Sequence, residues 1–326
     1  MGRYSLATRA VLALLILTLL ILAGACANIA KVSDETIPRL VTPLSEADFS
    51  TLVQQLQPLM NYQSLRSSRV SIQFIDAESA ERYRTADAQL VLRRPDKIRL
   101  IVQLPVAGTK IAEMVSQDNQ FRVAIYRDPY KRFLVGTNNA DYSQWRAKLG
   151  GREKQSALIN ARPFHFTDAL LIRPLHLGET QFVYSLEEAL VEEPDLHKGA
   201  KKGARLLRSF YVISELGLPA TGQGPTHTQR RFWFDRTDQV RLARQQIFDE
   251  RGTMATEVFY SNYLKLNPES PQLWPGVVLV MRPHDNYSAR LIFREGGGEL
   301  NPPDLPESAF VLENKEGLPE TNLDKP

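Results

Sequence analysis

The residue types that most often carry catalytic or metal chemistry are sparse in this 326-residue chain and form none of the usual patterns. The five histidines are scattered with no metal-ligand spacing, and Cys26 is the one cysteine. The sequence holds no HExxH, CxxC, GxSxG or GxxxxGK motif. We therefore expect no catalytic residues, no metal site and no cofactor. Paired carboxylates assembled from distant positions remain the one open route to an enzyme.

Cys26 stands where an N-terminal apolar run meets polar sequence. The run AVLALLILTLLILAGAC covers residues 10–26 and follows two arginines. A basic start, an apolar stretch and small residues before a cleavage point are typical of a secretory signal peptide. The small residues at 23–25 lead directly into the cysteine, and this resembles the bacterial lipobox, in which the thiol takes a diacylglyceryl group. We predict a signal peptide over 1–25 and lipid attachment at Cys26.

Two other interpretations of this segment stay open. It could be a plain transmembrane anchor, although a spanning helix needs about 20 apolar residues and this run is shorter. It could also be an ordinary signal peptide with a buried thiol. Ala27 follows the cysteine where an aspartate would retain an enterobacterial lipoprotein in the inner membrane. The sequence therefore favours a lipid-anchored protein of the cell envelope that faces the periplasm from the outer membrane.

Composition limits the partners of the rest of the chain. The formal net charge is +3, and loss of Arg3 and Arg9 with the signal peptide lowers it to about +1. Such a balance gives no strong attraction to nucleic acid. With no cysteine left for disulfides, the exported domain depends on its hydrophobic core alone.

Hydrophobic periodicity predicts an α+β fold that is mostly antiparallel. A helix is expected from an N-cap at Ser45 to about Leu65, followed by six short strands with tight connections. Those strands are expected at 70–75, 88–93, 98–104, 111–115, 121–126 and 133–135. Short strands joined by tight turns indicate an antiparallel meander rather than a parallel sheet.

The second half of the chain predicts more helix and a second run of strands. Helical patterns cover 142–149 and 157–172, where Pro163 must interrupt or begin a helix. Strands are expected at 181–186, 206–214, 230–235, 239–248, 254–264, 277–282 and 287–294. The charged stretch 191–205 is interpreted as a solvated loop.

The domain boundaries follow from these patterns. We expect a lipidated tether over 26–44, one folded domain over 45–315 and a frayed tail over 316–326.

Two stretches resemble the outer-membrane lipoprotein localisation family, known as LolA/LolB. The first, ADAQLVLRRPDKIRLIVQLPVAGTKIAEMVSQDNQFRVAI, matches the family's order of a strand, a proline-hydrophobic-glycine loop and two further strands. The second, ELNPPDLPESAFVLENKEG, is similar to the family's closing pattern. The resemblance implies a half-open, curved β-barrel with a helical lid that holds acyl chains. Cys26 brings the chain closer to the family's lipid-anchored receptor than to its soluble carrier.

The resemblance also implies a membrane-insertion loop at Pro105, Val106, Ala107 and Gly108. In the receptor, an exposed leucine in this loop helps to push cargo into the membrane. Val106 takes its place here, with a smaller side chain and a loop that is one residue longer. A buried turn residue is the alternative for Val106.

The expected function is the binding of acyl chains in an apolar cavity and their transfer, as lipoproteins or lipids, to the outer membrane. Its expected partners are those acyl chains, the membrane that holds the N-terminal lipid and a periplasmic carrier protein, but not nucleic acid. A filled core is the alternative, and the chain would then be a structural or sensor lipoprotein of an envelope complex. The residues expected to line the cavity are Val70, Ile72, Leu90, Leu92, Ile98, Leu100, Val102, Phe121, Val123, Phe232, Phe234, Val258, Tyr260 and Leu291.

Overall fold

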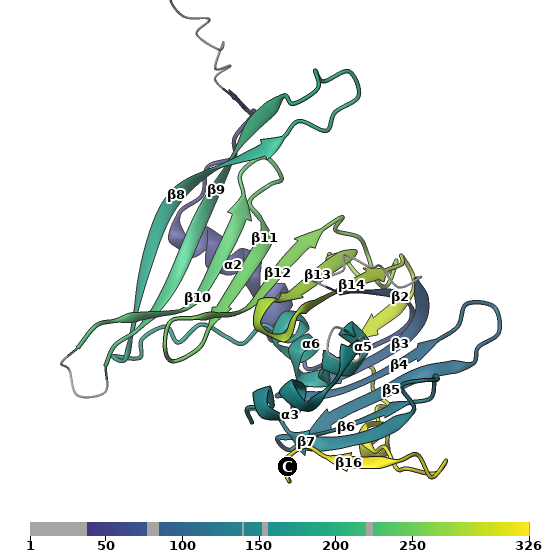
Figure 1. Ribbon diagram of the computed structural model, residues 1–326. Helices are drawn as coiled ribbons and strands as arrows, with labels where there is room; N and C mark the ends of the chain where they lie inside the picture. The colour runs from purple at the N-terminus through teal and green to yellow at the C-terminus, as the bar shows by residue number, and fades with distance from the viewer. Residues whose placement is uncertain (1–37, 77–84, 139, 152–155, 220–223, 326) are drawn as a thin grey trace, which may run out of the picture. The chain divides into compact units, whose positions relative to one another are not determined.

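The structure is a computed structural model that describes residues 38–76, 85–138, 140–151, 156–219 and 224–325 (Figure 1). The predicted signal peptide and Cys26 lie outside the described residues. The described residues divide into a small unit, which holds residues 38–39 and 192–206, and a large unit, which holds the others. Nearly all of the elements described below belong to the large unit.

The first run of strands is the antiparallel meander that the sequence predicts. It consists of β2 (Ser64–Asp76), β3 (Ala86–Arg93), β4 (Lys97–Gln103), β5 (Lys110–Gln117), β6 (Gln120–Ile125) and β7 (Arg132–Thr137). Each strand pairs antiparallel with the next along the chain. Side chains alternate along β3 between buried and exposed or half-buried, as a strand with one covered face requires.

The second run continues the same sheet. It consists of β8 (Phe182–Pro194), β9 (Arg205–Gly217), β10 (His227–Asp235), β11 (Arg241–Phe248), β12 (Met254–Ser261), β13 (Val277–Arg282) and β14 (Tyr287–Phe293). Strand β14 pairs antiparallel with β2 and so joins the two runs. The short β15 (Gly298–Leu300) also pairs with β2, and β1 (Arg39–Leu40) is the neighbour of β9. A mostly antiparallel, open and curved sheet with few helices is therefore confirmed.

Within the described residues, the sheet carries the helices α2 (Phe49–Asn61), α3 (Ser143–Lys148), α5 (Ala157–Asn160) and α6 (Pro163–Leu170). Single 3-10 turns occur at η1 (Pro283–Asp285) and η2 (Glu307–Phe310). As expected, Pro163 begins a helix, where its missing N–H costs nothing. Among the described helices, none has the length and apolarity needed to cross a membrane.

The predicted bounds of the first helix are wrong at both ends. Asp48, not Ser45, is the N-cap, because its carboxylate accepts a 2.8 Å hydrogen bond from the backbone N–H of Thr51. The helix ends at Asn61, and Leu65 already belongs to β2. Asp48 is three residues before Thr51 and therefore reaches a free N–H of the first turn. Ser45 lies farther upstream and does not cap the helix.

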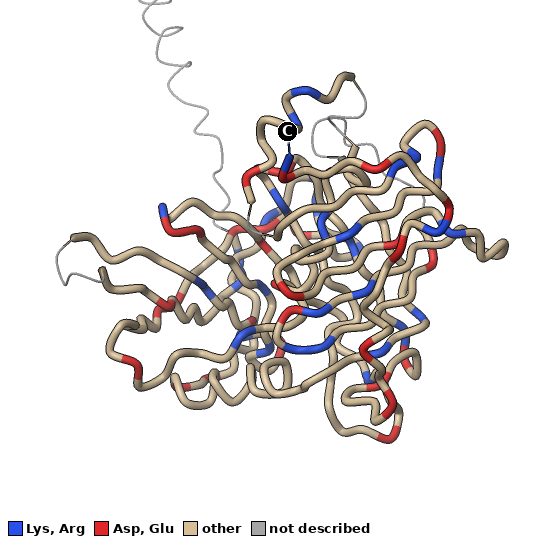
Figure 2. The backbone as a smooth tube through the Cα atoms, turned by 90° about the horizontal axis from the view of Figure 1, so that it is seen from below, with Lys and Arg blue, Asp and Glu red and all other residues tan. Residues whose placement is uncertain are grey.

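The two faces of the sheet build two hydrophobic cores. Residues of α2, α5 and α6 pack on the inner face, together with alternate residues from β2 to β6 and from β9 to β14. Because α6 contacts β4, β5 and β6 as well as β13, the sheet of the large unit curves around this helix. A smaller core on the outer face holds Val115, Phe133, Phe310 and Leu312. Acidic and basic residues are interspersed along the backbone, in keeping with the small net charge (Figure 2).

The C-terminal residues are ordered, in contrast to the frayed tail expected over 316–326. Residues 320–322 form β16 (Glu320–Asn322), which pairs parallel with β7. Leu323 is 5% exposed, and the Asp324 carboxylate accepts hydrogen bonds from Thr137 and Tyr142. Three residues of strand are too few to produce a periodic signal, so composition alone suggested disorder.

Two further segments are more ordered than expected. In the predicted tether, the N–H of Val41 donates to Leu207 O at 2.9 Å, so chain pairing begins before residue 44. In the charged stretch 191–205, β8 continues to Pro194 and β9 begins at Arg205. Arg205 pairs with Glu192, so only the tip of this hairpin in the small unit is a loop.

Candidate functional site

The first candidate site is the apolar interior under the helices. All fourteen residues predicted to line a cavity point to the inner face, and none is more than 5% exposed. They belong to one cluster with Leu52 and Leu56 of α2 and Phe166 and Ala169 of α6. In the described conformation these side chains are buried in one cluster with residues of the helices. That they line a space for a ligand stays a prediction.

The segment 156–174, which carries α5 and α6 and is called the cover segment below, is held down through its backbone. Backbone carbonyls near its C-terminal end, between residues 169 and 174, accept hydrogen bonds from side chains. Tyr260 Oη donates to Ala169 O at 2.7 Å, and Tyr62 Oη donates to Leu170 O at 2.5 Å. These bonds satisfy carbonyls that lack partners at a helix C-terminus.

Arg94 connects the cover segment to α2. Its Nη2 donates to Ile172 O at 2.9 Å and to Leu59 O at 3.2 Å, while its Nε donates to Tyr62 O at 2.8 Å. One guanidinium therefore joins the C-terminal ends of α2 and of the cover segment to the turn between β3 and β4. Burial lowers the pKa of Arg94, and the side chain remains a cation at neutral pH.

Arg230 fixes the residues that follow. Its Nη1 donates to Arg173 O at 2.7 Å and its Nη2 to Pro174 O at 3.0 Å. The same guanidinium pairs with Glu215, which is fully buried. Burial raises the pKa of Glu215, but hydrogen bonds and charge from Arg230 outweigh it and leave that pKa below its usual range.

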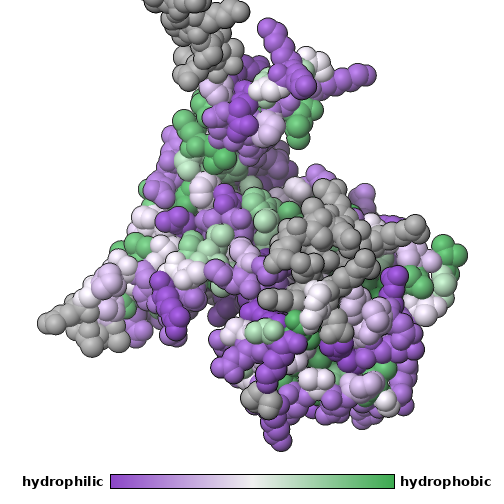
Figure 3. Space-filling view, in the orientation of Figure 1, coloured by the Kyte–Doolittle hydropathy of each residue, from purple (hydrophilic) through white to green (hydrophobic). Residues whose placement is uncertain are grey.

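The second candidate site is the β4–β5 hairpin, where the structure places the predicted insertion loop. Its four residues are exposed, and Val106 is fully exposed. Leu104, just before the loop, is 42% exposed. Val106 also has φ +71°, a backbone conformation that is a genuine outlier for a β-branched residue. The buried alternative for Val106 is therefore wrong, and apolar surface covers the end of this hairpin, at the right of Figure 3.

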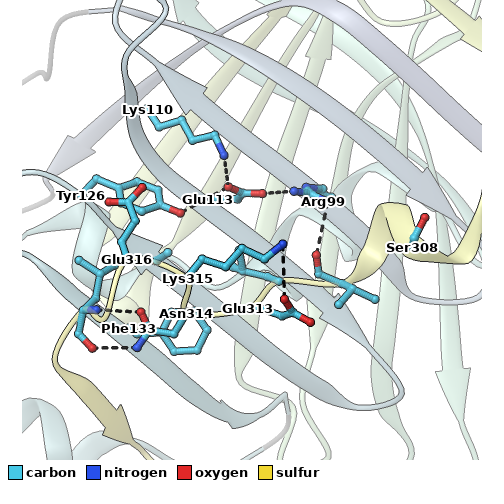
Figure 4. A pocket seen from close by; sticks show the side chains of 14 residues that line it. Arg99, Lys110, Glu113, Tyr126, Phe133, Ser308, Glu313, Asn314, Lys315 and Glu316 are labelled. Carbon is cyan, nitrogen blue, oxygen red and sulfur yellow. Dashed lines mark hydrogen bonds and ion pairs between the residues drawn. The ribbon is translucent and has the colours of Figure 1, made fainter.

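A third candidate is a polar cavity of about 440 Å³ on the outer face. The C-terminal residues cross β4–β7 there and pack Phe310, Leu312 and Leu318 on the sheet. Arg99, Lys110, Glu113 and Tyr126 line the cavity from the sheet, and residues 313–316 line it from the opposite side (Figure 4). Cations and carboxylates are balanced in this lining, so the cavity suits a polar group rather than an acyl chain.

Glu113 is the centre of the outer cavity. It is 1% exposed, receives a 2.8 Å hydrogen bond from Lys110 and pairs with Arg99. Burial raises the pKa of Glu113, but the hydrogen bonds and charges of Lys110 and Arg99 outweigh it, and the pKa lies below its usual value. Arg99 also donates to Ala309 O, so this ion pair helps to fix the C-terminal residues on the sheet.

Sequence reasoning missed Arg94, Arg230 and Glu113. Nothing near Arg94 in the sequence indicates that its partners lie 35 and 78 residues away. Glu113 offered a weak signal, because it is a lone acid within the apolar strand KIAEMVSQ.

Comparison with solved structures finds partial likeness at low identity. A LolA superfamily protein from Nitrosomonas europaea aligns over 82% of this chain and 99% of its own, with 11% identity and a TM-score of 0.41. A DUF1329 family protein from Desulfovibrio piger aligns over 80% and 95%, with 12% identity and a TM-score of 0.41. A putative outer membrane lipoprotein-sorting protein domain from Vibrio parahaemolyticus aligns over 82% and 96%, with 11% identity and a TM-score of 0.38. No family model and no curated protein matches the chain.

Replacement of Arg94 by alanine should loosen the cover segment. The change removes three hydrogen bonds from a charged donor, so we expect amide hydrogens at 157–172 to exchange about 10- to 100-fold faster. The measurement is hydrogen exchange followed by mass spectrometry. Arg173→Ala is the matched control, because Arg173 lies in the same segment but its side chain is 66% exposed. Equal exchange in both variants would contradict the role given to Arg94.

Replacement of Glu113 by glutamine should change how stability depends on pH. Because the pKa of Glu113 is lowered on folding, its carboxylate stabilises the fold above about pH 4.3 and loses this effect as the pH falls through the folded-state pKa. We expect Glu113→Gln to lower the free energy of unfolding by about 2 kcal/mol at pH 7. The free energy of unfolding of this variant should also decline less steeply towards pH 3. Urea unfolding at several pH values measures both. Glu316→Gln, an exposed acid of the same cavity, should behave as the wild type, and an unchanged pH slope in Glu113→Gln would refute the assignment.

Proposed function

We propose that this chain is a lipid-anchored, non-enzymatic protein of the bacterial cell envelope that binds acyl chains between its sheet and the cover segment and transfers them to a membrane. The observation that carries the proposal is the construction of the apolar interior. A continuous apolar sheet face lies under a helical segment whose end is held by Arg94, Arg230, Tyr62 and Tyr260 through its backbone carbonyls.

This construction suits a segment that opens. Opening breaks a few hydrogen bonds from side chains to the backbone of the cover segment, which can re-form as a group, and it uncovers the apolar surface between the segment and the sheet. An acyl chain that replaces the cover segment on the sheet restores the buried surface, at about 0.8 kcal/mol for each methylene. Ligand binding can therefore compensate for opening.

The β4–β5 hairpin supports delivery to a membrane. A fully exposed valine with φ +71° neither packs in the core nor relaxes the backbone. Strain of this kind persists where it serves a function. Leu104 and Val106 together provide an apolar tip that can enter the interfacial region of a bilayer.

Attachment at Cys26 completes the proposal. A diacylglyceryl group on this residue would keep the domain at the membrane, facing the periplasm, with the outer membrane favoured over the inner one. The cargo would be lipoproteins or lipids, supplied by a soluble periplasmic carrier. Transfer would run from weaker to stronger affinity, with no reaction catalysed.

A second candidate function is that of a structural or sensor lipoprotein in an envelope complex. One observation favours it: the fourteen inner residues are buried in one cluster with residues of α2, α5 and α6 in the described conformation. On this account the interior is a permanent core, and the outer cavity around Glu113 is the contact with a protein partner.

Photo-crosslinking in cells distinguishes the two functions with the full-length protein. A diazirine analogue of palmitate is supplied to the cells, the protein is purified, and crosslinked peptides are identified by mass spectrometry. We expect crosslinks on β3 to β6 that excess palmitate suppresses. Peptides from the exposed tip of the β8–β9 hairpin serve as the internal control. Equal labelling of both regions, or none, would favour the permanent core.

Replacement of Val106 by glutamate should separate binding from delivery. A charge at the hairpin tip opposes entry into the bilayer, so transfer of a fluorescent acyl lipid from the protein to liposomes should slow by about tenfold, equivalent to roughly 1.4 kcal/mol. Crosslinking by the palmitate analogue should not change. Leu196→Glu is the matched control, because Leu196 is also an apolar residue on a loop and is 89% exposed. Unchanged transfer by Val106→Glu would remove the hairpin from the mechanism.

A further inference from the structure

Three arginines gather at one end of the apolar interior. Arg146 comes from α3, Arg162 from the residue before α6, and Arg282 from the end of β13. They are called the arginine cluster below. Asp285 of η1 is the carboxylate among them and pairs with both Arg146 and Arg282.

Arg162 is the most buried member, at 3% exposed. Its Nη1 donates to Ala161 O at 2.9 Å and to Ile159 O. Its guanidinium lies over the rings of Phe121, Tyr142 and Trp145, at 5.3 to 5.9 Å from their centroids. Within the described part of the chain, no carboxylate forms an ion pair with Arg162.

The remaining polar neighbours do not balance these charges. His165 is buried, and its Nδ1 shares a 2.6 Å hydrogen bond with Tyr287 Oη. Its Nε2 lies 3.7 Å from a carboxylate oxygen of Asp285. Burial, followed by the charges of the three arginines, lowers the pKa of His165 well below its usual range, so the ring is neutral. The exposed Asp141 acts on Arg146 from the rim of the cluster.

Burying a cation is costly, and the charge of Asp285, the aromatic rings and the carbonyls offset only part of that cost for Arg162. Burial is also the main reason why the pKa of Arg162 falls to about 10. Phe121, one of the rings under Arg162, is among the fourteen inner-face residues. The cluster therefore presents uncompensated positive charge where the apolar interior ends.

We propose that the arginine cluster binds the oxyanion of an acyl ligand, a carboxylate or phosphate group, while the ligand's chain lies along the inner face of the sheet. The inference rests on the proposed function and makes it specific, because it selects anionic amphiphiles over neutral lipids. A guanidinium offers paired N–H donors that match a carboxylate or phosphate, and it keeps its charge at every physiological pH. Arg162 provides the buried contact, and Arg146 and Arg282 increase the local positive potential.

A displacement assay on the full-length protein tests this inference. The protein is equilibrated with a photoreactive hexadecanol and increasing concentrations of either palmitate or hexadecanol, which share chain length but differ in charge. Irradiation then crosslinks the probe that is still bound to the inner face, and the loss of crosslinking measures its displacement. One charge-assisted contact predicts that palmitate displaces the probe at concentrations about tenfold lower. Arg162→Met should reduce this ratio to below about threefold, and Arg290→Met, a change at an exposed arginine on β14, should preserve it.

Each outcome has a separate meaning. If both lipids displace the probe equally from the wild type, the cluster does not recognise the headgroup, although the binding of acyl chains is still supported. If the probe never crosslinks to the inner face, acyl binding itself fails. If Arg162→Met does not fold, Arg146→Met and the wild-type ratio decide the matter. Inorganic phosphate alone should leave the preference for palmitate intact. If millimolar phosphate abolishes this preference, the cluster is a site for free anions and the proposal is overturned.

Discussion

The structure depends on how buried backbone carbonyls find partners while an apolar sheet face stays covered. The cover segment crosses that face in two short helices, which leaves carbonyl groups at 169–174 without helical partners. Such groups cannot be buried unpaired. Tyrosines at 62 and 260 and arginines at 94 and 230 donate to them from four separate positions in the chain. These donors make the burial of the segment's end possible.

The apolar interior and its polar contacts make different contributions to the fold. Apolar side chains supply most of the free energy that keeps the helices on the sheet, since each buried leucine contributes about 2 kcal/mol. They do not select one position for a helix, because hydrophobic contact has little directionality. Arg94, with three defined acceptors, supplies that direction. On the proposed function, an acyl chain would replace the first contribution but not the second, so ligand exchange and closure would depend on different contacts.

Much of the sheet could be predicted from the sequence, because a strand with one buried face shows apolar residues at every second position. Leu90 and Leu92 of β3 lie on the face that this alternation indicates, and the same holds for Val258 and Tyr260 of β12. The start of α2 was less certain, because serine and aspartate are both good N-caps and only geometry distinguishes Asp48 from Ser45. The order of β16 could not be predicted, since a three-residue parallel pairing depends on β7, far away in the chain. Arg94 and Arg230 escaped prediction for the same reason, as their partners are carbonyl groups that any residue carries.

The parallel pairing of β16 with β7 has a consequence for biogenesis. In an exported chain the N-terminus crosses the membrane first, so residues 320–322 would be the last part of the sheet to arrive. Until then, the outer edge of β7 has unpaired N–H and C=O groups along it, and such an edge can recruit strands from other chains. Strand β16 thus ends the sheet at this edge. A chain cut short before residue 320 would keep the edge of β7 unpaired and prone to pairing with strands of other chains.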